Sequence, residues 1–391
     1  MQTEHRLTVL VRNDSDTGVT MPVRGGIPLP PGFAAEDSNF AITDSTGSAM
    51  ECQTRALSNW PCGSIRWLLI DLSASLDAGE TRHYYLSTDT TPQSPSSIHS
   101  LGTSGLSNGL ITIEATPSGI LIANDNIVDL TMENGDGRTY ECELEETTIE
   151  DLGPVRGTMC STGHLIDTKG HRGFSFRLRT SLYAGSTRLK LEPQIMIDGD
   201  TGVIHRIRDL RLTITPNAPL TGARFDNAIS EFTPITNDPY RRLQIDDRLT
   251  QTGSEEPRQH RSTGSMEIQT RHARLSVAMR DFWQQWPKDL TATTTNASIG
   301  LFPRFEAGQF DHMEPWYKYQ YLFHNDCYQL RTGQSRRWEI WIDQEASLDS
   351  LTTTVCTPLT LSAPSNEALG TGAWGPSLQS MYLEWRNTIT L

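Results

Sequence analysis

The chain has 391 residues and a formal net charge of −14. This length is sufficient for two or three domains, each with a buried core. The acidic balance excludes general nucleic-acid binding, because contact with phosphates requires a cationic surface. A polyanionic ligand would therefore need a local cluster of basic residues. No apolar run approaches the roughly 20 residues that cross a bilayer, so no membrane span is expected.

The composition predicts an all-β protein. Hydrophobic residues make up 36% of the chain, and Thr, Ser and Gly are abundant, as in strand-rich folds with many turns. Residues 1–6 lack the charged, apolar and small-residue regions of a signal peptide. The localisation therefore stays open: cytoplasmic, or secreted if the chain is a trimmed form.

Residues 1–90 consist of short alternating runs separated by turn residues, which predicts a small N-terminal β-barrel. Within this region, residues 53–72 are expected to form a strand, a tight turn and a second strand. Pro61 fixes φ in the turn, and Gly63 can take a positive φ. From Ser64 onward the side chains are β-branched, aromatic and aliphatic, as in a buried strand.

Residues 91–107 are rich in Ser, Thr and Pro, and we expect an interdomain linker there. Residues 108–355 then alternate apolar and polar positions over long runs. This pattern is typical of antiparallel sheets with one solvated face and predicts a large central β-sandwich. The last part, residues 356–391, is expected to be an extension with one short helix, because Leu378, Met381, Tyr382 and Trp385 share a helix face.

Six cysteines are spread along the chain. Cys52 and Cys62 flank the predicted turn, and Cys142 and Cys160 flank another expected hairpin. The sequence leaves open whether either pair forms a disulfide. The spacing of Cys and His does not match a structural zinc site, so neither a metal nor a cofactor is expected.

Several segments resemble the exo-rhamnogalacturonan lyase-like family. The N-terminal ones are a Gly/Pro-rich turn at residues 25–32, Gln53, and the run Trp60-Pro61-Cys62-Gly63-Ser64-Ile65-Arg66-Trp67, in which Cys62 replaces the family's usual acidic residue. Residues 280–288 and 299–303 resemble segments of the second region. The resemblance implies a RIFT-type barrel followed by a β-sandwich. A C-terminal α/α barrel would begin where this sequence stops, so the resemblance leaves enzymatic activity open.

The densest group of aromatic and polar residues lies at residues 310–328. Sugar sites combine flat aromatic rings with polar groups, so residues 280–288 and 310–337, which include this segment, are the candidate glycan site. The alternative is that Tyr319, Tyr321 and Phe323 line the sandwich core at period two. The predicted substrate-binding residues are Arg280, Trp283, Trp286, Lys288, Trp316, Tyr317 and Asn325.

The resemblance implies β-elimination on a uronate-containing polysaccharide or oligosaccharide, if the chain is active. That reaction needs a cation to neutralise the carboxylate and a base to remove the C5 proton. The candidate catalytic residues are Lys318, His324, Tyr328 and Arg337. Solvated strand faces explain the arginines equally well.

Two other functions stay open from the sequence. The first is a small glycoside hydrolase with a carboxylate pair, for which Asp311, Glu314 and Asp326 are candidates. The second is a non-catalytic structural module that self-associates through strand edges, so that a homo-oligomer is conceivable.

Overall fold

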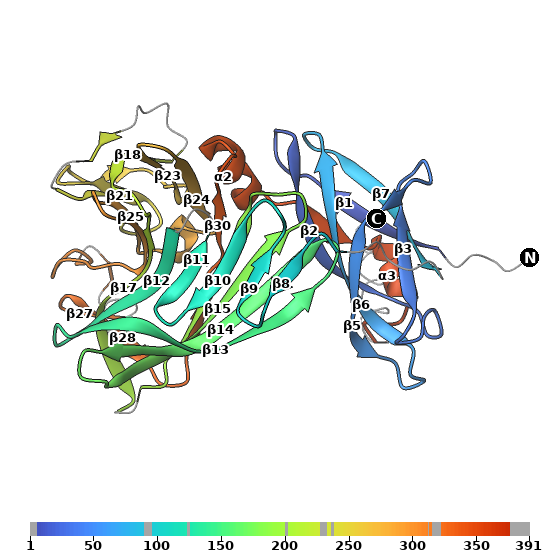
Figure 1. Ribbon diagram of the computed structural model, residues 1–391, viewed down its shortest axis with the longest axis horizontal. Helices are drawn as coiled ribbons and strands as arrows, with labels where there is room; N and C mark the ends of the chain where they lie inside the picture. Colours follow the sequence, from blue (N-terminus) through green and yellow to red (C-terminus); the bar gives the residue numbers. More distant parts are fainter. Residues whose placement is uncertain are drawn as a thin grey trace, which may run out of the picture. The chain divides into compact units, whose positions relative to one another are not determined.

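The computed structural model describes residues 6–89, 96–122, 126–199, 202–226, 233–235, 238–311, 313–314 and 322–375. The chain divides into two compact units (Figure 1). The N-terminal unit comprises Met1–Ser96, Gly153–Arg156 and Thr357–Leu391, and the sandwich unit comprises Ser97–Leu152 and Gly157–Cys356. Strands dominate both units, as the sequence predicts. None of the helices in the described residues is long and apolar enough to cross a membrane.

The N-terminal unit contains a five-stranded and a three-stranded antiparallel sheet. Their orders are β31-β1-β7-β3-β4 and β2-β6-β5. The strands are β1 Leu7–Arg12, β2 Val19–Pro28, β3 Asn39–Thr43, β4 Ala49–Met50, β5 Cys52–Asn59, β6 Ile65–Leu76, β7 Thr81–Asp89 and β31 Thr360–Ser362, with helix α3 at Ser365–Gly370. Residues far apart in sequence meet here, because Leu10 of β1 pairs with Ser362 of β31.

The predicted turn between β5 and β6 is confirmed. The Trp60 N–H donates to the Ser64 carbonyl at 2.8 Å, and Gly63 has a φ of 87°. Gln53, another residue of the family resemblance, has a structural partner in the same unit. Its Oε1 accepts a hydrogen bond from the Arg156 backbone N–H at 3.0 Å. These residues therefore stabilise the barrel.

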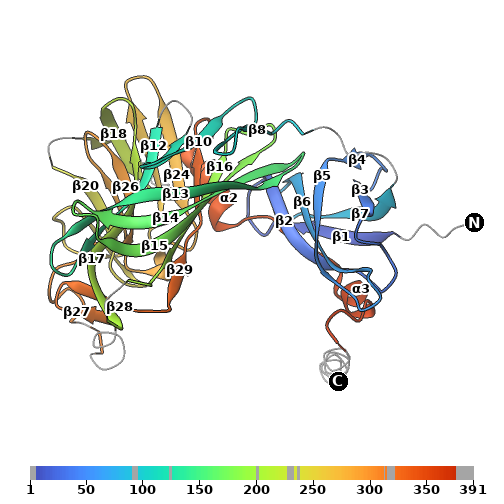
Figure 2. The ribbon, with the colours of Figure 1, turned by 60° about the horizontal axis from the view of Figure 1, so that its bottom comes forward.

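The sandwich unit has two layers of antiparallel strands (Figure 2). The first layer runs β8-β9-β10-β11-β12-β17, and β17 then pairs with β26 in one half and with β28 in the other. The bounds in this layer are β8 His99–Leu101, β9 Gly105–Ser107, β10 Thr112–Thr116, β11 Gly119–Ile122, β12 Asn126–Asn134, β17 Ile204–Thr215, β20 Tyr240–Gln244, β21 Leu249–Thr252, β22 Arg258–Gln259, β25 Lys288–Ala292, β26 Ala297–Phe302, β27 Phe323–His324 and β28 Cys327–Arg331.

The second layer runs β13-β14-β15-β16-β30-β24-β23-β18. Its strands are β13 Thr139–Leu152, β14 Arg156–Asp167, β15 Arg172–Tyr183, β16 Leu189–Met196, β18 Leu220–Phe225, β19 Thr233–Pro234, β23 Ser265–Thr270, β24 Arg274–Met279, β29 Ser335–Arg337 and β30 Ile340–Asp343. Helix α2 spans Leu348–Cys356, and a 3-10 helix, η1, spans Trp283–Gln285. The layers meet at the β12–β13 hairpin, where three residue pairs join them.

The alternation in the sequence explains this core. In β12 and β17, every second residue is buried (Val128, Leu130 and Met132; Leu210, Leu212 and Ile214), and Phe176 and Leu191 of the second layer belong to the same cluster. The residues between them are polar and form the outer face of each layer. Because apolar residues recur at every second position of the strands, each layer has one hydrophobic face, and the hydrophobic faces of the two layers pack against each other.

Three features differ from the sequence-based expectation. The predicted linker contains β8 and β9, whose Ser- and Gly-rich sequences give no strand signal. The segment after Cys356, expected as a separate extension, groups with the N-terminal unit through β31. All six cysteines are free thiols, so neither disulfide considered from the sequence is present. The helix predicted from Leu378, Met381, Tyr382 and Trp385 lies outside the described residues.

Candidate functional site

A groove of about 830 Å³ opens at the end of the sandwich unit where several strand connections converge. We call it the basic groove. It lies between the β12–β13 turn, the β14–β15 turn and the start of β17. Its lining includes Asn134, Gly135, Asp136, Arg138, Gly170, His171, Arg172, Phe174, Gly199, Ile204, His205, Arg206 and Gln329. Within the described residues, three arginines and two histidines thus surround one cavity.

Two hairpin turns position these basic residues, and in both an Asn or Asp side chain accepts hydrogen bonds from backbone N–H groups of the turn. In the first turn, the Asn134 side-chain oxygen accepts hydrogen bonds from the N–H groups of Asp136 and Arg138 at 3.0 and 2.9 Å. Gly137 in this turn has a φ of 80°. An Asx side chain followed by a glycine with positive φ fixes such a turn, so Arg138 is placed at the groove by local sequence.

The second turn repeats the arrangement with an aspartate. Asp167 Oδ1 accepts from the N–H groups of Lys169 and His171 at 2.9 and 2.8 Å, and Gly170 has a φ of 82°. The His171 ring nitrogen Nδ1 lies 2.8 Å from Asp167 Oδ2. Burial alone would raise the pKa of Asp167, but these hydrogen bonds lower it to about 2. Asp167 therefore stays ionised and fixes the His171 ring at the groove.

The three arginines differ in how their charge is compensated. Arg138 Nη1 lies 3.4 Å from Asp167 Oδ2, and Arg172 Nη2 lies 2.9 Å from Glu145 Oε1. Arg206 is exposed and forms no ion pair with any residue of the described ranges. Arg206 is thus the cation with the most freedom to bind an anionic group of a ligand.

His205 is the most enclosed of the basic residues in the groove. Its Nε2 lies 2.9 Å from Thr332 Oγ1, and its ring meets the edge of the Phe174 ring with centroids 5.4 Å apart. Burial lowers the pKa of His205, and the nearby Asp198 carboxylate opposes this only in part. The imidazole is therefore neutral at pH 7.

Those residues predicted from the sequence that the structure describes do not line the basic groove. Lys288 is 3% exposed, and its Nζ donates to the carbonyls of Gln285 and Pro287 at 2.7 and 3.0 Å. Tyr328 is also buried, and its hydroxyl donates to the Pro303 carbonyl at 2.6 Å. Burial raises the pKa of Tyr328. Both polar groups thus have hydrogen-bond partners within the protein.

The remaining predicted residues lie at the surface or outside the described ranges. Arg280 pairs with Glu339 at 3.2 Å, and Arg337 Nη1 lies 3.7 Å from Glu192. Trp283 is half-buried with the Arg261 guanidinium 4.1 Å above its ring, and Trp286 is also half-buried. His324 and Asn325 are exposed side by side at a turn. Trp316, Tyr317 and Lys318 lie outside the described residues, so their predicted roles stay predictions.

The carboxylates considered for hydrolysis are also dispersed. Asp311 and Glu314 are exposed, and Asp326 Oδ2 accepts from Arg208 Nε at 2.7 Å. The Arg208 hydrogen bond lowers the pKa of Asp326. An ionised carboxylate tied to an arginine is a poor general acid.

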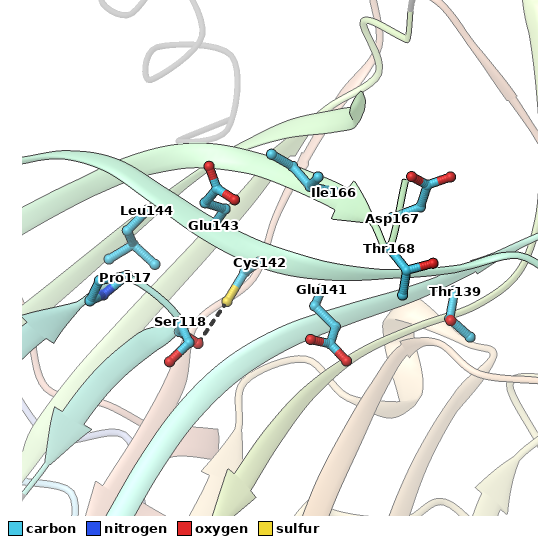
Figure 3. A pocket seen from close by; sticks show the side chains of 10 residues that line it. All are labelled: Pro117, Ser118, Thr139, Glu141, Cys142, Glu143, Leu144, Ile166, Asp167 and Thr168. Carbon is cyan, nitrogen blue, oxygen red and sulfur yellow. Dashed lines mark hydrogen bonds between the residues drawn. The ribbon is translucent and has the colours of Figure 1, made fainter. Parts of the chain in front are cut away.

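A second cavity, of about 440 Å³, is acidic (Figure 3). It is lined by Glu141, Glu143 and Asp167, and Cys142 Sγ donates to the Ser118 carbonyl at its wall. A neighbouring cavity of about 260 Å³ shares Ser118, Glu141 and Cys142 with it and is also lined by Asp129. Burial, followed by the charge of Glu141, raises the pKa of Asp129 to about 6.

Comparison with known proteins identifies the N-terminal part of the chain. Residues 6–87 match the family model described as the PcRGLX-like N-terminal RIFT barrel domain. The N-terminal unit is a RIFT barrel domain. This confirms the resemblance drawn from the turn at residues 25–32 and from the run at residues 60–67. Among curated proteins, the sequence has no match.

The fold of the chain, with the RIFT barrel included, has neighbours among solved structures. An α-mannosidase from Enterococcus faecalis V583 aligns with a TM-score of 0.57 and 11% identity over 92% of this chain and 46% of its own. A glycosyl hydrolase family 38 protein from Enterococcus faecalis aligns with a TM-score of 0.57 and 10% identity over 92% and 47%. The chain thus spans slightly less than half of these structures, and at such identity the likeness concerns the fold alone.

The basic groove was not found from the sequence, because its residues come from turns about 30 residues apart. A signal does exist in Asn134-Gly-Asp-Gly-Arg138 and Asp167-Thr-Lys-Gly-His171. Each is an Asx residue with a glycine three positions later and a basic residue directly after it. Finding them together requires knowing that β12–β13 and β14–β15 turn at the same end of the sandwich.

Proposed function

We propose that this chain is part of a carbohydrate-active protein and binds a uronate-containing glycan in the basic groove. The RIFT barrel domain supports the carbohydrate relation, since the matched family is rhamnogalacturonan lyase-like. The observation that carries the proposal is the gathering of Arg138, Arg172 and Arg206 around one cavity of a chain whose net charge is −14. An acidic protein needs such a local cluster to hold a polyanion.

The groove also suits the sugar ring itself. Val203 and Ile204, at the start of β17, are 70% and 53% exposed, and Ile204 lines the groove. Apolar side chains next to cations match a uronate, which combines C–H faces with a carboxylate. Arg206 would bind the carboxylate, because its guanidinium can donate two parallel hydrogen bonds.

Calorimetric titration with an oligogalacturonate of defined length tests the proposal. Loss of a hydrogen bond to a charged group costs about 1.5–3 kcal/mol, so Arg206→Ala should weaken binding by roughly 10- to 100-fold. Arg248→Ala is the matched control, because Arg248 is 76% exposed and lies outside the groove lining. Added salt should weaken binding of the wild type. Equal affinity of the wild type and Arg206→Ala, or equal binding of a neutral glucan, would contradict the proposal.

A second candidate function is glycoside hydrolysis at the acidic cavities. Asp129 and Glu141 lie on one face, since Thr131 pairs with Glu141 and Asp129 is two positions along β12. Diagonal neighbours of this kind are roughly 7 Å apart, within the range of inverting carboxyl pairs. Asp129, with its raised pKa, would be the acid and Glu141 the base. New reducing ends without unsaturated products, abolished in Asp129→Asn, would favour this candidate.

A further inference from the structure

Tyr140 of β13 is a buried tyrosine whose hydroxyl forms no hydrogen bond with any residue that the structure describes. The residue is only 7% exposed. Buried tyrosine hydroxyls usually have a partner, as Tyr328 has in the Pro303 carbonyl. Tyr140 departs from this rule, so a ligand group is needed to satisfy its hydroxyl.

The hydroxyl of Tyr140 is accessible from the basic groove. Tyr140 lines this groove together with Arg138 and Phe174. Its hydroxyl is not among the described polar atoms that are both fully buried and without a partner. Since the oxygen has no partner and is not fully enclosed, it is open to the cavity that its side chain lines. A ligand in the groove can therefore reach a group that both donates and accepts a hydrogen bond.

The neighbours of Tyr140 fix the position of its ring. Its backbone pairs with Met132 of β12 on one side and with Asp167 of β14 on the other. A Cβ built on Gly173 would lie 3.2 Å from Tyr140 Cδ1, so the ring packs against the glycine backbone. The ring also belongs to the hydrophobic core of the sandwich unit. The hydroxyl is therefore held in place before a ligand arrives, and little conformational entropy is lost on binding.

We propose that Tyr140 is a specificity-determining residue of the basic groove and that its hydroxyl binds a hydroxyl group of the glycan. The inference rests on the proposed function, because the uronate glycan supplies the ligand hydroxyl. Arg138, Arg172 and Arg206 bind anionic groups, but cations alone do not distinguish a sugar acid from another anion. A hydroxyl on a fixed ring does, because a ligand without a hydrogen-bonding group at that point leaves it unpaired.

The charges next to Tyr140 favour a neutral partner over a second carboxylate. Asp167 is directly opposite Tyr140 on the neighbouring strand, and directly opposite side chains share a face of the sheet. Hydrogen bonds lower the pKa of Asp167 to about 2, so it is ionised and repels an anion. Arg138, two positions before Tyr140, has its Nη1 3.4 Å from Asp167 Oδ2, so its charge is compensated. A sugar hydroxyl fits these surroundings.

The test compares two Tyr-to-Phe substitutions in the full chain. Tyr140→Phe removes a hydroxyl without a protein partner, so the midpoint of urea unfolding should not change. Binding of oligogalacturonate, followed by calorimetry, should weaken by about 3- to 10-fold. Because the lost bond joins neutral groups, this factor should be the same at low and at high salt. Tyr328→Phe is the matched control: it should lower the unfolding midpoint and leave Kd unchanged.

The outcomes separate this proposal from the proposed function. If the wild type does not bind oligogalacturonate, both are overturned. If Arg206→Ala weakens binding but Tyr140→Phe does not, only the role of Tyr140 is overturned. A lower unfolding midpoint of Tyr140→Phe also overturns it, because the hydroxyl would then have a structural role. A loss of affinity that shrinks with added salt overturns the assignment of a ligand hydroxyl, because the partner would then be charged. Weaker binding with unchanged stability and unchanged salt dependence supports it.

Discussion

Replacing Lys288 with methionine should stabilise the sandwich unit near pH 7 and remove part of its pH dependence. Lys288 is buried between two backbone carbonyls and the rings of Phe302 and Trp338, which lie 5.5 and 6.0 Å from Nζ. Burial lowers the pKa of Lys288 from 10.5 to about 7, with a smaller contribution from Arg336, although Asp289 opposes the shift. A neutral amine has two N–H donors, and two carbonyls accept them.

The magnitude follows from proton linkage. A shift from 10.5 to about 7 corresponds to a penalty of about 4 kcal/mol at pH 7. Methionine removes this penalty but leaves two carbonyls without a donor, at about 1 kcal/mol each. The net gain should be about 2 kcal/mol at pH 7.

The sign of the pH effect is also fixed. Between pH 7 and 10.5 the unfolded chain keeps a proton on Lys288 that the folded chain has lost, so wild-type stability increases with pH. From pH 7 to 8.5 this increase should be about 1.6 kcal/mol, and the advantage of Lys288→Met should shrink by the same amount. Urea unfolding followed by tryptophan fluorescence at both pH values measures it.

Lys169→Met is the control for Lys288→Met, because Lys169 is exposed in the β14–β15 turn. It should change neither the stability nor its pH dependence. If Lys288→Met keeps the wild-type slope with pH, or is less stable at every pH, the charge-burial reasoning is refuted. If the variant also loses glycan binding while remaining folded, Lys288 is a ligand residue, as the sequence first suggested.

Three other substitutions test neighbouring parts of the structure. Asp129→Asn should raise the free energy of unfolding at pH 7 by about 2 kcal/mol, after allowing for partial exposure of Asp129. The reason is that the raised pKa of Asp129 makes wild-type stability fall as the pH rises towards 6. In urea titrations the gain should vanish near pH 4, and a gain that is the same at every pH would contradict the prediction. Gln53→Ala should cost the N-terminal unit about 1–2 kcal/mol by freeing the Arg156 N–H, and an unchanged unfolding midpoint would exclude that role. Tyr328→Phe should cost about 1 kcal/mol, because it removes the hydrogen bond to the Pro303 carbonyl, and an unchanged unfolding midpoint would exclude that contribution.

The fold was predictable where local patterns dominate. Alternation in strands such as β12 and β17 indicates one buried face, and the structure confirms it at Leu130 and Leu212. The turn at Gly63 followed from its freedom to take a positive φ. The short strands β8 and β9 were missed because pairing, rather than composition, makes them strands.

The candidate site residues were harder to predict, because sequence proximity does not report accessibility. The segment at 280–288 combines aromatic, proline and lysine residues, as sugar sites do, but Lys288 is directed into carbonyls of its own turn. His205, which lines the groove, belongs to no sequence motif, and its side-chain partner Thr332 is 127 positions away along the chain. Such a pairing becomes visible only when β17 and β28 lie side by side.

The pairing of strand β31, near the end of the chain, with strand β1 has a consequence for how the RIFT barrel forms. Strand β31 adds to β1 through pairs such as Leu10 with Ser362, and Gly25 of β2 leaves room for Leu361. During synthesis, one edge of β1 therefore stays unpaired until β31 is translated, some 350 residues later. Such non-local closure is slow, and an unpaired edge is prone to association with other nascent chains. A fragment cut after residue 87 would retain that open edge permanently, and its yield from refolding should improve when a peptide carrying residues 357–375 is supplied.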